Sequence, residues 1–137
     1  MPSRKSLEIQ QYYGHPRNAF WRILFTLFDN TFSSNYDDKK SFAIKHNIAI
    51  WDVCHTATRK GSLDSDIEKE SPNRINELIA DNPSICTIAF NGQKAAKLYY
   101  KYFPKYENIN YITLLSTSPA NAKYSLEEKL KDWSQIK

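Results

Sequence analysis

Apolar positions along the chain alternate between helical spacing and short continuous runs, and this alternation predicts the order of elements. Residues 18–28 (NAFWRILFTLF) are apolar nearly all round, which predicts a deeply packed helix. We expect a second helix that is capped by Asp37 and runs through His46, with Asn47 as its stop. Two helices are therefore predicted between residues 18 and 46.

The rest of the chain alternates in the same way. In chain order the predicted elements are a buried strand over 48–54, a long loop over 55–70, a helix from Ser71-Pro72 to Asn82-Pro83, a second buried strand over 85–90, a helix over 93–102, a third strand over 111–115 and a helix from Leu126. Ser125 to Glu128 form a capping box at the start of the last helix, where Leu126, Leu130 and Trp133 share one face.

Strands that alternate with helices at this spacing predict an α/β fold with a parallel sheet. Ligands bind such sheets at the carboxyl ends of the strands. Three polar segments are expected there: the loop after Cys54, Asn91-Gly92, and residues 116–119. A length of 137 residues fits a single domain over 1–137.

Composition narrows the function only slightly. The chain is 41% hydrophobic and 14% aromatic, enough for a core, and its net charge of +4 suits a polyanionic partner without demanding one. Cys54 and Cys86 lie in apolar runs and are predicted to be buried, reduced thiols, because no CxxC pair indicates zinc or redox work. Neither a secretory signal nor a membrane-length apolar run is present, so we expect a cytoplasmic protein.

Six short motifs together are more specific than any one of them. They are MPSRKSL at 1–7, QYYGHPRNAFW at 11–21, IAIWDV at 48–53, GSLDSDI at 61–67, FNG at 90–92 and STSPANA at 116–122. In this order they resemble the uracil-DNA glycosylase superfamily, most closely its hypoxanthine-DNA (DNA-deoxyinosine) glycosylase branch. The resemblance covers nearly the whole chain and implies a three-layer α/β/α fold with a short parallel sheet.

The chain also departs from the family pattern at two places. Family members usually carry a strand and a Gly-Ser pair just before the Met-Pro that here is Met1-Pro2. That strand is central in the four-stranded sheet of the superfamily, so the fold is expected to lack its first central strand, with consequences for stability and activity. Leu115 stands where the family tends to have a proline.

The resemblance implies roles for the residues around His15-Pro16. Asn18 matches the catalytic asparagine, whose carbonyl can orient water and stabilise positive charge on the sugar, although it could equally cap the following helix. Tyr13 matches a base-stacking aromatic, and Tyr12 is a second candidate. His15 could donate to a phosphate or the leaving base, or could be structural. Arg17 could bind phosphate or be solvated.

The resemblance assigns roles to two later segments as well. Asn91 can offer a donor and an acceptor to a base edge, or can simply be a turn residue. Ser116, Thr117 and Ser118 match the superfamily's serine–proline loop, which grips DNA phosphates, and a generic loop is the alternative. Lys123 adds a charge nearby, and Trp51 is interpreted as core.

These roles imply a monofunctional DNA glycosylase that flips and excises hypoxanthine from deoxyinosine by hydrolysis of the N-glycosidic bond. It is expected to be a nucleoid-associated monomer that needs no cofactor or metal and has DNA containing a deaminated base as its partner. Uracil excision is the runner-up, and a catalytically impaired DNA-binding relative is a further alternative. A nucleotide-binding α/β domain is disfavoured because neither GxGxxG nor GxxxxGK[ST] is present.

Overall fold

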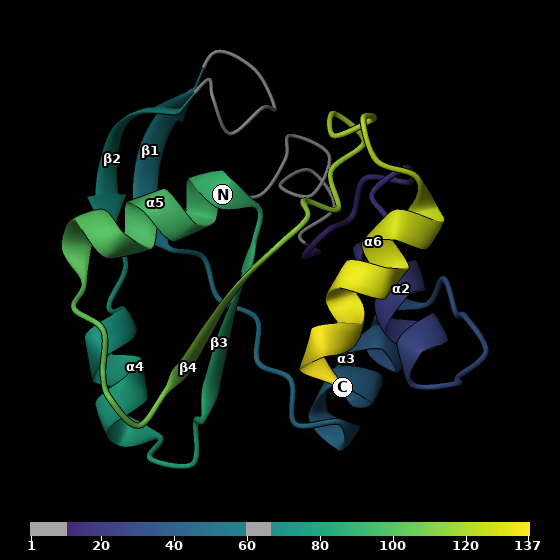
Figure 1. Cartoon of the computed structure of the whole chain (residues 1–137), viewed down its shortest axis with the longest axis horizontal. Helices are drawn as coiled ribbons and strands as arrows, with labels where there is room; N and C mark the ends of the chain where they lie inside the picture. The colour runs from purple at the N-terminus through teal and green to yellow at the C-terminus, as the bar shows by residue number, and fades with distance from the viewer. Residues whose placement is uncertain (1–10, 60–66) are drawn as a thin grey trace. The chain divides into compact units, whose positions relative to one another are not determined.

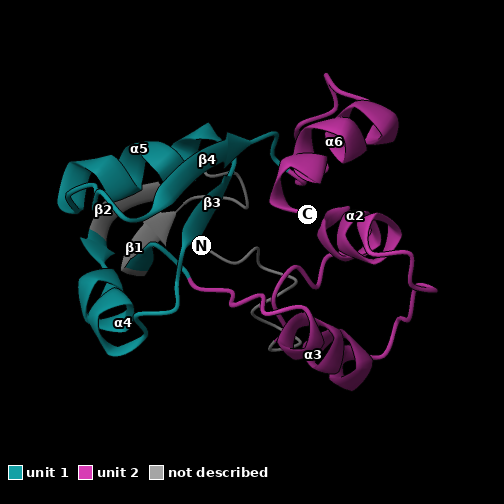
Figure 2. Cartoon of the chain, turned by 60° about the horizontal axis from the view of Figure 1, so that its bottom comes forward, with its two compact units in different colours: residues 1, 52–116 teal, residues 2–51, 117–137 magenta. Residues whose placement is uncertain are grey.

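The computed structural model describes residues 11–59 and 67–137 (Figure 1). They belong to two compact units, one within residues 52–116 and the other formed by the flanking segments up to residue 51 and from residue 117 (Figure 2). Among the helices in the described ranges, none is both long enough and apolar enough to cross a membrane. The two units are described separately below.

The unit formed by the two flanking segments is helical. Its elements are α2 (Phe20–Leu27), α3 (Tyr36–Lys45), α6 (Leu126–Trp133) and the short 3₁₀ helix η2 (Ser134–Ile136). Most of α2 is buried, namely Phe20, Trp21, Ile23, Leu24 and Phe25. The predicted deeply packed helix is therefore confirmed, although it begins two residues after Asn18.

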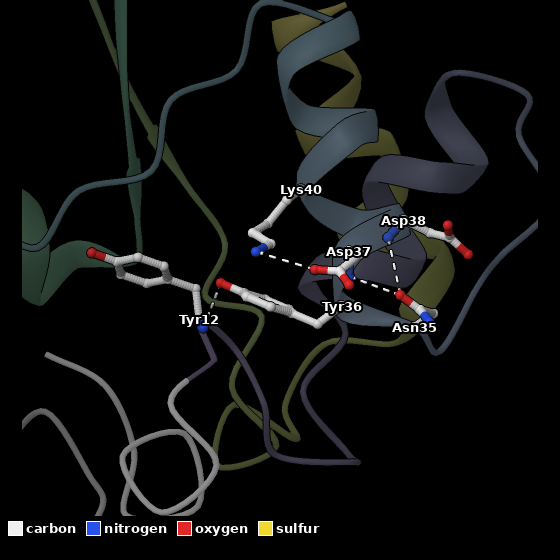
Figure 3. A network of polar contacts seen from close by, with 6 residues as sticks. All are labelled: Tyr12, Asn35, Tyr36, Asp37, Asp38 and Lys40. Carbon is white, nitrogen blue, oxygen red and sulfur yellow. Dashed lines mark hydrogen bonds and ion pairs between the residues drawn. The ribbon is translucent and has the colours of Figure 1, made fainter.

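Helix α3 begins at a cap that the sequence pattern did not identify. Asn35, rather than Asp37, is the N-cap: its Oδ1 accepts hydrogen bonds from the backbone N–H of Asp37 at 2.8 Å and of Asp38 at 3.2 Å (Figure 3). Asp37 lies in the first turn, where its carboxylate stabilises the positive end of the helix dipole. The predicted stop is confirmed, because Asn47 adopts a left-handed φ of +57° that ends the helix.

Ser125 is confirmed as the N-cap of α6, since its Oγ accepts the Glu128 backbone N–H at 3.1 Å and its hydroxyl donates to Glu128 Oε1 at 3.3 Å. The predicted apolar face is only partly correct. Trp133 is buried and its ring meets Phe20 edge-on at a centroid distance of 5.7 Å, but Leu126 is 48% exposed. Lys129 is buried instead, and this burial lowers the pKa of its amine.

The other unit is built on a parallel pair of strands, β3 (Thr87–Asn91) and β4 (Asn110–Leu114), joined through α5 (Gln93–Tyr102). Helix α4 (Ile75–Asp81) precedes β3. The two strands, labelled in Figure 1, pair with Thr87 opposite Asn110 and Asn91 opposite Leu114. The predicted α/β class with a short parallel sheet is confirmed. Its core contains Ile75, Phe90, Ala96 and Tyr99.

A second, antiparallel sheet occupies the stretch that was predicted to be a loop. It pairs β1 (Cys54–Arg59) with β2 (Ile67–Pro72). The prediction of a loop over 55–70 is therefore wrong for both strands. The remaining residues, 60–66, lie outside the described residues and include all of the GSLDSDI motif except Ile67. The predicted helix start at Ser71-Pro72 is also wrong, because both residues end β2 and α4 begins at Ile75.

Residues 48–53 are not a strand, so that prediction is wrong apart from Cys54. Asn73 binds two backbone carbonyls at the end of this segment. Its side chain donates to the Asp52 carbonyl at 3.1 Å, and its N–H donates to the Val53 carbonyl at 2.8 Å. Trp51 is 52% exposed, which contradicts its interpretation as core. Cys54 is buried as predicted, whereas Cys86, which precedes β3, is exposed.

The Tyr99 phenol provides a test of the packing around β3 and β4. Its side chain is 1% exposed, and its hydroxyl lies 3.5 Å from that of Tyr111 and 3.4 Å from the Pro104 carbonyl. Burial, followed by the hydrogen bond with Tyr111, raises the pKa of Tyr99 well above its ordinary value. Because the folded-state pKa is the higher one, this contribution to stability is complete below the unfolded pKa of about 10 and is lost as pH rises beyond it.

We therefore expect the difference in unfolding free energy between the unmodified protein and Tyr99→Phe to be constant near neutral pH and to shrink above about pH 10. Urea unfolding at a series of pH values measures this difference. The Tyr102→Phe variant, at the end of the same helix, is the matched control. A difference that stays constant up to strongly alkaline pH would contradict the proposed shift.

Candidate active site

The carboxyl ends of β3 and β4 bring two of the predicted polar segments together. Asn91 ends β3 opposite Leu114, and Gly92 follows with its N–H donating to the Leu114 carbonyl at 3.0 Å. An ideal Cβ built on Gly92 would lie 3.1 Å from the Cβ of Ser116. The expectation that Asn91-Gly92 and Ser116 meet at this edge of the sheet is confirmed.

Gly92 makes this close approach possible. Its φ is +96° and its ψ is 162°, a conformation that essentially only glycine adopts. The same residue is the N-cap of α5, so Asn91 is held between the end of a strand and the start of a helix. The side-chain amide of Asn91 is thereby placed on a backbone that is fixed from both sides.

The tyrosines of the loop before α2 are held by aromatic and backbone contacts. The ring of Tyr13 stacks on Phe20 with a centroid distance of 3.9 Å and an interplanar angle of 23°. Its φ of +53° is unusual for a bulky residue. Both backbone groups of Tyr12 are hydrogen-bonded. Trp21 Nε1 donates to the Tyr12 carbonyl at 2.9 Å. The Tyr12 N–H donates to the Tyr36 hydroxyl at 3.2 Å (Figure 3).

The turn that follows orients His15. The Arg17 backbone N–H donates to His15 Nδ1 at 3.1 Å, and the Asn18 N–H donates to the His15 carbonyl at 2.9 Å. An Nδ1 that accepts a hydrogen bond leaves Nε2 as the nitrogen that carries the proton. The ring can therefore present an N–H donor. Arg17 is exposed.

Asn18 is fixed at the start of α2. Its Oδ1 accepts the backbone N–H of Phe20 at 3.0 Å, one position ahead of the formal cap residue Ala19. Asn18 is therefore not the N-cap that the sequence allowed, because Ala19 holds that position, but its Oδ1 still satisfies the first N–H of the helix. An amide oxygen has two lone pairs, so Asn18 Oδ1 can still accept a second hydrogen bond. The residue is half-buried, which leaves its side chain partly accessible.

The 116–119 segment joins the loop before α2 through its backbone. The Ala19 N–H donates to the Thr117 carbonyl at 3.1 Å, and Thr117 itself is 0% exposed. A fully buried hydroxyl has no surface for a phosphate, so Thr117 is placed to position the loop rather than to contact DNA. Ser118 forms the turn that follows: its Oγ accepts the Ala120 N–H at 3.2 Å. Lys123 is exposed, with its amine 5.5 Å from the centre of the Tyr124 ring.

The candidate residues therefore form two groups within separate units. Asn91 and Ser116 belong to the β3–β4 unit, and all the others belong to the helical unit, namely Tyr12, Tyr13, His15, Arg17, Asn18, Thr117, Ser118 and Lys123. Sequence reasoning missed two supporting residues, Phe20 as the platform for Tyr13 and Tyr36 as the acceptor for Tyr12. No local pattern connects residue 36 to residue 12. Across the described ranges, no group of three or more metal-ligating side chains occurs.

Comparison with known proteins identifies a consistent set of relatives. The family model described as the uracil DNA glycosylase superfamily matches residues 1–137. A curated relative named hypoxanthine DNA glycosylase from Methanosarcina acetivorans is 35% identical over 139 residues, covering 99% of this chain and 85% of the relative. A relative of the same name from Methanosarcina barkeri is 33% identical over 138 residues, covering 98% and 84%.

A solved structure agrees with these relatives. It is a solution NMR structure of a Methanosarcina acetivorans protein assigned to the uracil DNA glycosylases. The two structures superpose with a TM-score of 0.78 at 30% sequence identity, over 98% of this chain and 83% of that one.

Proposed function

The chain belongs to the uracil DNA glycosylase superfamily, and from this premise we propose that it is a DNA repair glycosylase that excises hypoxanthine from deoxyinosine. The resemblance seen in the sequence motifs is confirmed by the family match and by the two relatives named hypoxanthine DNA glycosylase. The structural observation that carries the proposal is the fixed Asn18 carbonyl at the start of α2. DNA is accordingly the macromolecular partner.

The reaction requires water to attack the sugar carbon as the bond to the base breaks and positive charge develops on the sugar. Asn18 is too weak a base to remove a proton from water, but its carbonyl dipole can orient the water and stabilise that charge. The hydrogen bond from Phe20 fixes the carbonyl before the substrate arrives, so little reorganisation is needed during the reaction. The leaving base departs with the electron pair of the broken bond and takes up a proton, and the attacking water gives one up to solvent, so the products are the free base and an abasic sugar.

The target nucleotide has to leave the duplex stack before it can react. We assign Tyr13 as the aromatic that stacks on the flipped base, because its ring is already held in one orientation by Phe20. The left-handed φ of Tyr13 supports this role, since strained backbone is concentrated at functional sites. Tyr12 is assigned the supporting role, because both its backbone groups are bonded to residues of the helical unit.

Asn91 is assigned to the edge of the flipped base. Hypoxanthine and uracil both present a carbonyl beside a ring N–H, and one amide can pair with this combination through its N–H and its oxygen. Asn91 therefore explains recognition of a deaminated base but not a preference between these two. Uracil excision consequently remains the second candidate function.

Phosphate contacts are assigned to polar groups at the surface of the helical unit. Ser118, Arg17 and Lys123 are at least partly exposed, and the Nε2–H of His15 is a donor that its own turn leaves available. Such groups hold a nucleic acid in register without reading its sequence. Thr117 is assigned to the support of this loop through its backbone carbonyl.

The decisive experiment compares two labelled duplexes that differ only in one base, deoxyinosine in the first and deoxyuridine in the second. With protein in excess, we expect abasic sites to form from the deoxyinosine duplex at least about tenfold faster, a difference of about 1.4 kcal/mol in activation free energy. Alkaline cleavage and gel electrophoresis measure the abasic product. A duplex with a normal pair at the same position is the control.

Each alternative predicts a different pattern. Faster release from the deoxyuridine duplex would replace hypoxanthine by uracil as the substrate. Binding of both duplexes without base release from either would favour the catalytically impaired DNA-binding relative.

A further inference from the structure

The net charge of the chain is concentrated in one segment. Residues 82–106 contain four lysines and no aspartate or glutamate. The whole chain has 19 basic and 15 acidic residues, so the remainder, with 15 of each, is formally neutral. The excess of +4 therefore comes from a segment that runs through β3 and α5 to the loop after α5.

Three of these lysines share one face of α5. Lys94, Lys97 and Lys101 are spaced i, i+3 and i+7, which places them within an arc of about 60° on a helix of 3.6 residues per turn. They span about 10 Å along the axis, the length of about three phosphates of one DNA strand at one phosphate per 3.4 Å. We call these three residues the lysine stripe.

The opposite face of α5 is committed to the core. Ala96 and Tyr99 are buried on that face and pack with Phe90 of β3, whereas the buried Leu98 lies beside the lysine stripe. This burial fixes the rotation of the helix, so the lysine stripe is directed away from the β3–β4 sheet. Lys97 and Lys101 are exposed, and Lys94 is half-buried.

The loop after α5 extends the basic surface. The amine of Lys105 lies 4.9 Å from the centre of the Tyr100 ring. Tyr100 is 42% exposed. No acidic side chain is present on α5 itself, because its sequence is QKAAKLYYKY. A solvated helix usually mixes charges of both signs on its outer face. The single sign found here indicates attraction to a polyanion.

The position of α5 connects this surface to the candidate base-binding residue. The helix begins immediately after Gly92, so Lys94 follows Asn91 by only three positions. We propose that the lysine stripe binds the phosphates of the DNA strand that flanks the flipped nucleotide at Asn91. This inference rests on the proposed function, because it takes DNA as the polyanion and Asn91 as the residue at the base.

The test measures how the affinity for a duplex depends on salt. The variant Lys94→Gln/Lys97→Gln/Lys101→Gln keeps residues that favour helix and removes three charges. Each lost lysine–phosphate contact reduces the slope of log K against log salt by about 1, so we expect a reduction of about 3. Affinities for deoxyinosine and normal duplexes are expected to fall by the same factor, since phosphate contacts carry no sequence information.

The matched control removes the same charge elsewhere, with Lys40→Gln/Lys45→Gln/Lys131→Gln in α3 and α6. It is expected to change the slope by less than about 1. Circular dichroism verifies that both triple variants retain helix. If the stripe variant loses its structure, Lys97→Gln alone, with an expected change of about 1, replaces it.

The outcomes separate this inference from the proposed function. Equal slope changes in both triple variants, or none in the stripe variant, would overturn the lysine stripe as a DNA contact. If base release is observed but the slope is unchanged, the function stands and the inference fails. If the slope changes but the unmodified protein releases no base, the lysine stripe stands as a DNA contact and the glycosylase function fails.

Discussion

Replacement of Asn18 by serine is expected to lower the single-turnover rate of base release by about 10²–10³-fold, the range typical for loss of one preorganised polar group at a transition state. The reason lies in the two uses of Asn18 Oδ1. It caps α2 through the Phe20 N–H, and it is the proposed acceptor for the attacking water. Serine can supply the cap but lacks the amide carbonyl, so stability should change by less than about 0.5 kcal/mol.

Asn18→Ala is the matched variant, because it removes both uses. It should lose activity to the same extent as serine and should also lower the free energy of unfolding by about 1 kcal/mol. Single-turnover abasic-site formation and urea unfolding measure the two effects separately. If the serine variant released base at nearly the normal rate, Asn18 would be a helix cap and not the catalytic residue.

Replacement of Gly92 by alanine is expected to lower the free energy of unfolding by about 2–4 kcal/mol. A non-glycine residue at this φ and ψ costs of order 1–3 kcal/mol, and the added methyl group would lie 3.1 Å from Ser116 Cβ. Because this strain falls between Asn91 and α5, we also expect weaker base release. Chemical denaturation and the single-turnover assay measure these two effects.

Ser116→Gly separates the two causes in a double-mutant cycle. The double variant Gly92→Ala/Ser116→Gly removes the close contact but not the backbone strain, so it should recover only part of the lost stability. Full recovery would show that φ imposes no cost at Gly92. A single Gly92→Ala variant as stable as the unmodified protein would contradict the described approach of the two segments.

The elements that could be predicted from sequence are those whose signals are local. Residues 18–28 are apolar enough for burial on any face, and Ser125 with Glu128 marks a helix start within four positions. The helical pattern after Asn91-Gly92 also predicted the strand-to-helix turn correctly. In each case the residues that determine the structure lie within one or two turns of it.

The errors arose where distant segments decide the structure. Residues 48–53 are short and apolar, as strands often are, but the Asn73 side chain binds their end instead of a neighbouring strand. The polar segments β1 and β2 form strands because they pair with each other. The sequence pattern within either segment alone does not reveal this pairing. Pro72 was interpreted as a helix start, although proline is also tolerated where a strand ends.

In the candidate site, too, local signals could be predicted and contacts between distant segments could not. Asn91 and Ser116 could be predicted to lie close together because both are at the carboxyl ends of the strands of one parallel pair. The burial of Thr117 could not, since it depends on the backbone of Ala19 and on the packing of helices from both ends of the chain. Sequence patterns thus predicted that Asn91 and Ser116 lie close together, but not that Thr117 is buried.

The hydrogen bond from Ala19 to Thr117 has a consequence for how the enzyme is made. The helical unit combines the N-terminal segment with residues from 117 onward, and Trp133 of α6 packs on Phe20 of α2. During translation, α2 therefore emerges long before the segment that covers its apolar face. Contacts between such distant positions slow folding. The turn that carries Asn18 should acquire its final support only when synthesis is nearly finished, so a nascent chain is expected to be inactive.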